Sequence, residues 1–427
     1  MSETKIPTKS EKRSKIVIFG NFGTGNFGNE ATLQAVHLNL RRLMPDAEFA
    51  CICSCPAIAS AAQNIAAFPI SPTILTGWTP RSRVARLLRR IVFGIPNELY
   101  RWVAGFRLLK GADALIVPGT GLLTDVHDLV SWGPYGVFRW SVLAKLRGCK
   151  LLFVSVGVGP LYGRLGREFA KLALGLADFR SYRDMSSLEC LKSIGFAAAN
   201  DRVYPDLAFS LPTALIPRDK TRECRPVAGL GLMHHAHMYG DIAHDDETYR
   251  NYTETFLALA KWLQNSGYDI RLLIGELSDP VSEFSRLLDE KLPRQGSTRV
   301  VLAPVKSVED LLAQFADTDF AVVTRFHNIV FALLNDKPVI SVSFHSKCAA
   351  LMDDMGLSEY CLQIDRLEID ELVEKVSCVQ ERLPQLKALI ASRKEKFRVS
   401  LEEQYQLIVS HCSVRGAPIQ QVALKVS

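Results

Sequence analysis

The stretch AVVTRFHNIVFALLNDKPVISVSFHSK, residues 321–347, decides the fold class. An apolar, β-branched run at each end is typical of a strand. Residues 328–334 between these runs have helical character, which ends before Pro338. A strand–helix–strand unit this short predicts parallel neighbouring strands, with functional groups at the carboxyl end of the first strand.

Arg325 and His327 follow the first of these strands, where the helix begins. A helix N-terminus favours anions, and a guanidinium binds carboxylate or phosphate through two parallel hydrogen bonds. An imidazole with an ordinary pKa suits proton transfer near neutrality. The pattern therefore predicts an anion site. The alternative is a surface ion pair beside a buried structural histidine.

The rest of the chain alternates twice between strand-like and helix-like runs. Strand-like runs begin at residues 15, 49, 114, 151 and 179, and a second series begins at 227, 269, 299, 321 and 339. We therefore predict an α/β protein with two doubly wound, Rossmann-like domains. The expected order is a flexible tail (1–14), a first domain (15–212), a linker (213–225), a second domain (226–365) and a helical segment (366–427) that could return to pack on the first domain.

Glycines follow three of the strands in the first half. Gly23, Gly25 and Gly28 satisfy G-x-G-x-x-G between a strand and a helix, which is the dinucleotide-binding pattern. That pattern also requires an acidic residue after the second strand, and residues 49–56 contain none. We therefore do not expect bound NAD. Tight turns, or backbone N–H groups that face an anion or a sugar, are the two remaining interpretations.

Four stretches, in this order, resemble the polysaccharide pyruvyl transferase family. They are GNFGTGNFGNEA (20–31), PGTGLLTD (118–125), YRDMSSLECL followed by PDLAF (182–209), and TRFHNIVFALLNDKPVISVSFHSK (324–347). The resemblance runs from about residue 15 to about residue 357. It implies a GT-B-like arrangement of the two domains. It also implies transfer of a pyruvyl group from phosphoenolpyruvate to a sugar as a ketal, with release of phosphate.

This reaction needs anion clamps for the donor, an acid for its methylene carbon and a base for the sugar hydroxyl. Arg325 and Arg183 are the expected clamps, and His327 is the expected acid or phosphate partner. Lys347 could add a positive charge. The alternative for Lys347 is an ordinary surface lysine.

On the first domain, Asp125 is the expected base and His127 the second choice. The alternative for Asp125 is a helix N-cap. The glycine loops supply further expected substrate-binding residues: Gly25, Asn26, Gly28 and Gly121.

We expect no metal and no cofactor, with phosphoenolpyruvate as donor substrate. His234, His235 and His237 lack a carboxylate at ligand spacing before Asp241. The alternative function is a GT-B-type glycosyltransferase using a nucleotide sugar, and a third is a non-catalytic member that binds glycan. A nucleotide-sugar enzyme would usually carry an acidic ribose-binding residue late in the second domain, where this chain offers cations.

Residues 81–110 concentrate positive charge. They contain eight arginine or lysine residues against Glu98 alone, a net charge of +7, whereas the whole chain carries +6. Apolar and aromatic residues are interleaved, so an anionic membrane surface is a predicted partner. The alternative is a solvated helix over a core. No nucleic-acid motif accompanies the segment.

Length and composition fit an ordinary two-domain globular protein, with 427 residues, 48% apolar and 22% charged. We do not expect the polar N-terminus to be a signal peptide, and no apolar run is long enough to span a membrane. Cys51, Cys53 and Cys55 are interpreted as small hydrophobes in a reducing compartment. We expect a cytoplasmic protein, peripheral on the inner membrane face, with a glycan or lipid-linked oligosaccharide as acceptor. The oligomeric state does not follow from the sequence.

Overall fold

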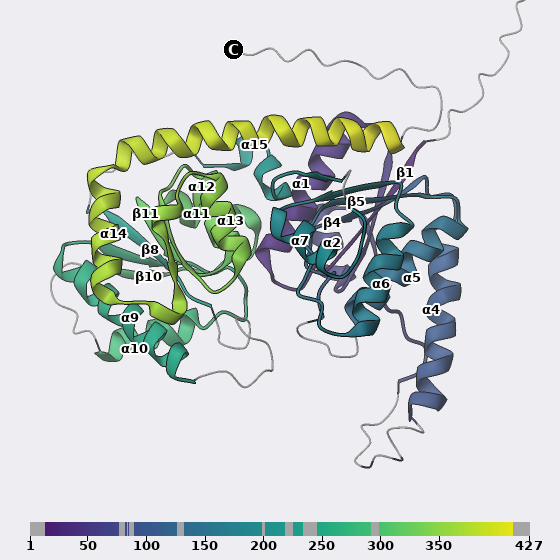
Figure 1. Cartoon of the computed structure of the whole chain (residues 1–427), viewed down its shortest axis with the longest axis horizontal. Coiled ribbons are helices and arrows are strands. Elements are labelled where there is room, and N and C mark those ends of the chain that lie inside the picture. The colour runs from purple at the N-terminus through teal and green to yellow at the C-terminus, as the bar shows by residue number, and fades with distance from the viewer. Residues whose placement is uncertain are drawn as a thin grey trace, which may run out of the picture.

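Two sheets, each made of parallel strands, lie side by side in the computed structural model of the chain (Figure 1). Helices cover both faces of each sheet, as doubly wound α/β domains require. The prediction of two Rossmann-like, doubly wound units is confirmed. The structure describes residues 13–76, 82, 84, 89–125, 132–198, 201–217, 225–233, 246–291 and 299–412.

The sheet of the first half has seven strands in the order β3-β2-β1-β4-β5-β6-β7, all parallel. Its strands are β1 (Lys15–Gly20), β2 (Glu48–Cys53), β3 (Ala66–Pro69), β4 (Ala114–Pro118), β5 (Lys150–Val156), β6 (Phe179–Tyr182) and β7 (Arg202–Val203). Its helices are α1 (Phe27–Leu43), α2 (Pro56–Gln63), α4 (Ile95–Leu108), α5 (Trp132–Leu146), α6 (Arg164–Gly175) and α7 (Met185–Ser193). A π-helical turn (Arg90–Gly94) precedes α4, and 3₁₀ turns occupy Leu207–Ser210 and Thr213–Leu215.

The sheet of the second half has six parallel strands in the order β10-β9-β8-β11-β12-β13. They are β8 (Val227–Gly231), β9 (Asp269–Leu272), β10 (Val300–Leu302), β11 (Phe320–Val323), β12 (Val339–Ser343) and β13 (Cys361–Gln363). The helices are α9 (Asp246–Asn265), α10 (Val281–Lys291), α11 (Val308–Ala316), α12 (Phe326–Leu334), α13 (Ser346–Asp354), α14 (Ile369–Glu381) and α15 (Leu383–Cys412). Single 3₁₀ turns lie at Ser358–Tyr360 and Ile364–Arg366.

The central strands are apolar throughout because both of their faces are buried. In β1, Ile16 and Ile18 pack into one core while Val17 and Phe19 pack into the other. A strand between two helix layers reads as a continuous apolar run. Cys51 and Cys53 of β2 are fully buried, which confirms their interpretation as small core residues. Cys55 was included in that interpretation, but it follows β2 and is only partly buried.

The larger core is continuous across the two halves, because α15 packs on both. This helix of 30 residues runs along the top of the molecule over both sheets (Figure 1). Lys394 pairs with Asp336 at the end of α12. Further along, the Gln404 side chain donates to the hydroxyls of Ser155 and Ser181 in the first half, at 3.0 and 2.8 Å.

Both sheets change winding direction between their first and fourth strands, at β1/β4 and at β8/β11. Ligands of doubly wound proteins bind beyond the carboxyl ends of the strands at such points. The glycine loop at 20–31 follows β1, and Arg325 and His327 follow β11. The fold therefore brings the motifs of the two halves to the edges where the halves face each other. The domain boundaries at 212 and 226 stay a prediction, because residues 218–224 lie outside the described chain.

Candidate functional site

Cationic side chains from both halves meet around the ring of Phe326, the first residue of α12. The guanidinium of Arg183, which follows β6, lies 4.7 Å from the centre of this ring. The Nζ of Lys347, in the first turn of α13, lies 5.8 Å from it. His327 follows the ring directly in the chain. The structure thus brings together Arg183, His327 and Lys347, which are far apart in the sequence, and an aromatic face stabilises cations beside it.

Asp206 connects the two halves of this cluster. Its Oδ1 accepts a hydrogen bond from the N–H of Ala208 and so caps the following 3₁₀ turn, at 3.0 Å. Its Oδ2 lies 3.4 Å from Nη1 of Arg183 and 3.8 Å from Nε2 of His327. Asp206 belongs to the PDLAF stretch, and no role for its carboxylate was predicted from the sequence. The PDLAF motif was the only sequence signal for it.

Arg183 is held loosely by carboxylates of the first half. Besides Asp206, it approaches Asp184, also at 3.4 Å. Asp184 caps α7 by accepting from the N–H of Ser187 at 2.7 Å, and charges and hydrogen bonds keep its pKa low although burial opposes this. The guanidinium packs on Gly157, where a Cβ atom would come within 3 Å of it. A glycine after β5 therefore makes room for this arginine.

The His327 ring rests directly on the backbone of the glycine loop. A Cβ atom added to Gly28 would lie 2.0 Å from Nδ1 of His327, so only glycine fits there. Burial lowers the pKa of His327 to about 4, because the charged imidazolium loses water; Asp206 opposes this shift, and Arg183 and Lys347 add to it. The imidazole is therefore neutral at neutral pH in the free protein. The sequence-based expectation of an ordinary pKa near neutrality is corrected accordingly.

Lys347 carries a charge that its surroundings do not offset. Within the described part of the chain, no carboxylate lies within ion-pairing distance of its Nζ. Burial lowers the pKa of Lys347 to about 8, and the neighbouring Arg183 contributes. The backbone N–H of Lys347 donates to Nδ1 of His345, at 3.3 Å, which caps α13. A desolvated ammonium beside a second cation favours an incoming anion.

Arg325, by contrast, already has two carboxylate partners. Its Nη1 lies 2.8 Å from Glu276 and its Nε 2.5 Å from the fully buried Asp279. Asp279 in turn accepts from the N–H groups of Gly275 and Glu276. The planar fork therefore ties the start of α12 to the loop after β9. Its charge is offset inside the protein, as in the ion pair that was the alternative from the sequence, although the pair is largely buried and not on the surface.

The glycine loop joins the halves. The N–H of Phe27 donates to the carbonyl of Gly275 at 3.2 Å, and the N–H of Leu277 donates to the carbonyl of Gly25 at 3.1 Å. The Asn26 side chain donates to Glu276, at 3.4 Å. The N–H of Gly23 donates to the Glu30 carboxylate of α1, at 2.7 Å. The predicted substrate-binding residues Gly25, Asn26 and Gly28 thus contact the second half of the chain itself.

Asp125 binds backbone N–H groups that precede α6, and these are not N-cap contacts, because Gly163 is the N-cap of α6 and has no side-chain cap. Residues 126–131, where a helix capped by Asp125 would begin, lie outside the described residues. The two carboxylate oxygens of Asp125 accept from the N–H groups of Tyr162 and Gly163, at 2.7 and 2.8 Å, where α6 begins. The side chain is fully buried. A base needs a free lone pair towards the acceptor, so Asp125 is not carried into the proposal below. Gly121 lies exposed after β4 with φ +71°, and His127 lies outside the described residues.

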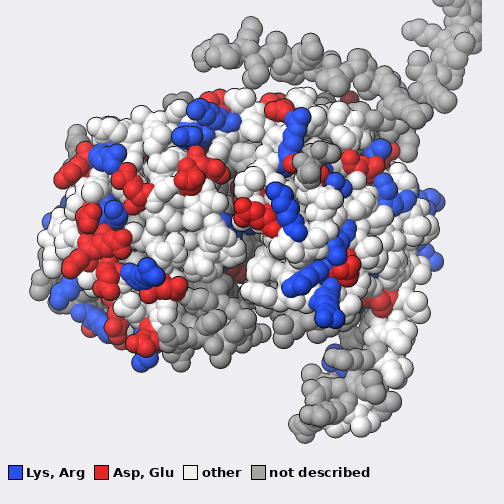
Figure 2. Space-filling model, in the orientation of Figure 1, with Lys and Arg blue, Asp and Glu red and all other residues white. Residues whose placement is uncertain are grey.

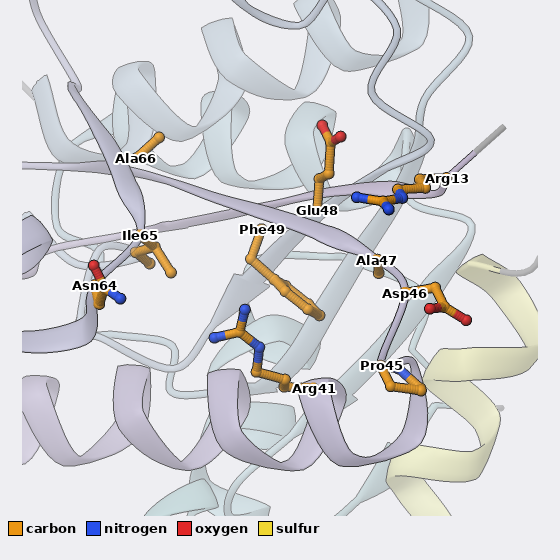
Figure 3. Close-up of a pocket in the computed structure, with 10 residues that line it drawn as sticks. All are labelled: Arg13, Arg41, Pro45, Asp46, Ala47, Glu48, Phe49, Asn64, Ile65 and Ala66. Atoms are coloured by element: carbon orange, nitrogen blue, oxygen red, sulfur yellow. The ribbon is translucent and has the colours of Figure 1, made fainter.

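A pocket of about 450 Å³ lies elsewhere, at the amino ends of β1 and β2 (Figure 3). This is the sheet edge opposite to the cation cluster, whereas ligands of such sheets bind at the carboxyl ends. We therefore do not assign it to the substrate. Its lining consists of Arg13, Arg41, Pro45, Asp46, Ala47, Glu48, Phe49, Asn64, Ile65 and Ala66.

Among the residues that the structure describes, no three histidine, cysteine or acidic side chains are arranged to hold a metal ion. The three clustered histidines, His234, His235 and His237, lie outside that part of the chain.

The sequence model of a family described as polysaccharide pyruvyl transferase matches residues 26–346. The chain belongs to this family. The match begins within the glycine loop, at Asn26, and includes Gly28, Arg183, Arg325, His327 and the start of α13; Lys347 follows directly. As a member, the protein is a transferase of polysaccharide biosynthesis, with pyruvyl transfer as its general reaction. One relative is the amylovoran biosynthesis protein AmsJ of Erwinia amylovora, 21% identical, with 90% of this chain and 96% of AmsJ covered.

Solved structures with the same architecture include a UDP-N-acetylglucosamine 2-epimerase from Listeria monocytogenes. It is 11% identical, with a TM-score of 0.59 and 93% of this chain and 98% of that chain covered. A glycosyltransferase from Rickettsia africae is 10% identical, with a TM-score of 0.53 and the same coverages of 93% and 98%. At these identities the likeness concerns the fold alone. It confirms the GT-B-like arrangement of the pyruvyl transferase.

Proposed function

We propose that this protein transfers a pyruvyl group from phosphoenolpyruvate to a sugar of a polysaccharide or of its lipid-linked precursor. The product is a pyruvate ketal, and inorganic phosphate is released. The observation that carries the proposal is Lys347, a desolvated cation without a carboxylate partner in the described chain, beside Arg183 and His327. This arrangement suits a small anion with two charged ends, such as a carboxylate and a phosphate.

The proposed roles follow from how far each charge is already offset. Lys347 and Arg183 bind the donor's anionic groups, and Arg325 positions α12 through Glu276 and Asp279. His327 is neutral before binding, and a bound phosphate dianion raises its pKa, so it takes up a proton with the donor. Asp206, at 3.8 Å, then stabilises the imidazolium that forms.

In the proposed reaction, His327 protonates the methylene carbon of the donor, which becomes the methyl group of the ketal. One sugar hydroxyl adds to the neighbouring carbon, and a second hydroxyl displaces phosphate from it. The two hydroxyl protons leave: one restores His327 and the other departs with phosphate. No oxidant, metal or further cofactor is required, so we propose phosphoenolpyruvate as the sole co-reactant. Because this metabolite is cytoplasmic, we propose that the reaction takes place there.

The alternative of a nucleotide-sugar glycosyltransferase shares the fold, as the Rickettsia neighbour illustrates. The cation cluster favours the pyruvyl donor over it. Nucleotide sugars need a contact to the ribose, and the described carboxylates nearest to the first turn of α12 are engaged by Arg325 or lie beside Arg183.

The test uses glycan extracted from cells that lack the gene as the acceptor. With phosphoenolpyruvate we expect phosphate release and a product heavier by one pyruvyl ketal in mass spectrometry. Lys347→Met should reduce release by about 100-fold or more. The exposed Lys306, replaced by methionine, serves as the matched control and should behave as wild type. Sugar transfer from a nucleotide sugar, with no phosphate released from phosphoenolpyruvate, would overturn the proposal.

A further inference from the structure

Helix α4 projects from the first half, and only one of its faces is fixed (Figure 1). On that face, Glu98 accepts from the Tyr135 hydroxyl at 2.6 Å and from the guanidinium of Arg139 at 2.9 Å, both on α5. Arg101 of α4 joins the same carboxylate at 3.1 Å. Gly105 packs so closely on Trp140 and Leu143 that a Cβ atom would lie within about 3 Å of them. The helix is therefore held in one orientation.

The opposite face of α4 is a bare apolar stripe. Ile95, Leu99, Val103 and Phe106 are 55, 64, 48 and 39% exposed. Their spacing of four, four and three residues places them on one side of the helix. Ile91 and Val92, just before the helix, are also about half exposed. The guanidinium of Arg147 lies 3.8 Å from the centre of the Phe106 ring, whereas no described residue covers Ile95, Leu99 or Val103. The projection is largely free of charge in the surface view (Figure 2). An aligned apolar patch on a rigid helix marks an interaction surface.

The charge around the stripe is positive. Arg89, Arg107 and Lys110 are exposed before, on and after α4. Glu98, the single acidic residue of residues 81–110, is already paired with two arginines. Arg81, Arg83 and Arg86 add three more charges in the sequence, although they lie outside the described residues. Apolar side chains flanked by arginine and lysine complement a lipid surface with anionic headgroups.

We propose that α4 docks this protein on a membrane surface that contains anionic lipid. The helix lies in the interface, with the side chains of the stripe among the acyl chains and the basic residues at the headgroups. It does not cross the bilayer: in the described chain, every helix is too short or too polar for that. This docking goes beyond the transfer reaction and would bring the enzyme to acceptors held on lipid.

A second copy of the chain fits the same surface less well. A stable interface buries about 800 Å² on each partner, and a single narrow helix stripe falls short of that. In a symmetric dimer the stripe would also meet itself, so that the arginines of one copy would face those of the other.

The experiment is flotation of the full-length protein with two kinds of vesicle, phosphatidylcholine alone and phosphatidylcholine with phosphatidylglycerol. We expect the wild type to float with the second kind only, and less at high salt. The double variant Leu99→Glu/Val103→Glu should lose on the order of tenfold or more in vesicle affinity. Val399→Glu is the matched control, because Val399 is 59% exposed on α15. It should bind as wild type does.

Phosphate release with a soluble glycan separates this proposal from the proposed reaction, since the α4 double variant should retain it. Equal partitioning of the wild type onto both kinds of vesicle, or onto neither, would overturn the docking proposal. So would unchanged flotation of the double variant. A wild-type dimer that dissociates on the same substitutions, without vesicle binding, would identify the stripe as a contact between copies instead.

Discussion

At the scale of single residues, the proposed chemistry depends on which charges are offset inside the protein. Arg325 has two carboxylates, Arg183 has two at the longer distance of 3.4 Å, and Lys347 has none within ion-pairing distance in the described chain. Burial and Arg183 lower the pKa of Lys347 to about 8 because its charged form is poorly solvated. Donor binding should relieve this penalty.

The affinity for phosphoenolpyruvate should therefore depend on pH through Lys347. A lowered pKa means that the free protein holds this proton only below about pH 8. Above that pH, a proton must be taken up on binding, so the dissociation constant should rise by up to about tenfold per pH unit. In Lys347→Arg the rise should disappear, because a guanidinium stays charged. Calorimetric titrations between about pH 7 and about pH 10 measure this; an identical rise in Lys347→Arg would exclude the lysine as its source.

His327 should give a second pH dependence, which appears in the reaction rate. An acid must be protonated, and the pKa of His327 is about 4 in the free protein. Both kcat/KM and kcat should fall as the pH rises and His327 loses its proton. The fall in kcat/KM reports the free enzyme and should occur at lower pH than the fall in kcat, which reports the complex with the bound donor. His327→Ala should remove both of these falls and lower kcat by about 100-fold or more, with a smaller effect on donor affinity. Loss of donor affinity alone would make His327 a phosphate ligand and not the acid.

The sequence located these residues but not their partners. Arg183 follows β6 directly, and His327 and Lys347 lie in the first turns of the helices after β11 and β12. Such positions share one sheet edge, so their gathering could be predicted. Asp206 and Asp279 could not be assigned, because their pairing depends on loops that are 23 to 46 residues from the arginines they meet. The sequence left Asp125 open as a base or a helix N-cap, and it could not show that its carboxylate accepts from the N–H groups of Tyr162 and Gly163.

At the scale of elements, the first turn of α1 and the first turn of α12 determine each other's position. Gly28 lets the His327 ring lie on the α1 backbone, while Asn26 and Phe27 hold the loop after β9. The sequence did not assign the G-x-G-x-x-G pattern to NAD binding, and this stays a prediction. Its structural use was not foreseen, because the surface that it contacts belongs to a segment about 250 residues away.

Gly28→Ala should therefore displace His327 without removing any functional group. The added Cβ atom would lie 2.0 Å from Nδ1, so the ring or α1 must move. We expect about a 10-fold or greater loss of kcat and about 1–3 kcal/mol of lost stability. Gly136→Ala in α5 is the matched control, since its Cβ atom meets nothing within 4 Å. Steady-state kinetics and denaturant unfolding measure both effects. A near-wild-type kcat in Gly28→Ala would show that the contact between Gly28 and His327 does not matter for catalysis.

Several elements eluded prediction for identifiable reasons. Helix α2 and strand β3, within residues 56–69, are short elements, and most of their residues are exposed. The segment therefore lacks a clear apolar period. The segment at 81–110 was recognised by its charge and its aromatic residues, but the sequence could not show which face of α4 stays bare. That depends on Glu98 meeting Tyr135 and Arg139 of α5.

At the scale of the whole molecule, two similar sheets share one larger core and one long helix, α15 (Figure 1). The alternation of strands and helices was sufficient to predict both sheets, since period and order are local properties of the sequence. How the halves meet depends on side chains from both, including Gly28 with His327 and Asn26 with Glu276. The donor site is proposed at this junction, so it needs both halves.

The most direct test of that central claim is saturation-transfer NMR on one sample that contains phosphoenolpyruvate and UDP-sugars together. It requires no acceptor. We expect saturation of the methylene protons of phosphoenolpyruvate, its loss in Lys347→Met and its retention in Lys306→Met, with no transfer to the UDP-sugars. Saturation of a UDP-sugar instead, unaffected by Lys347→Met, would contradict the pyruvyl donor and the site between the halves.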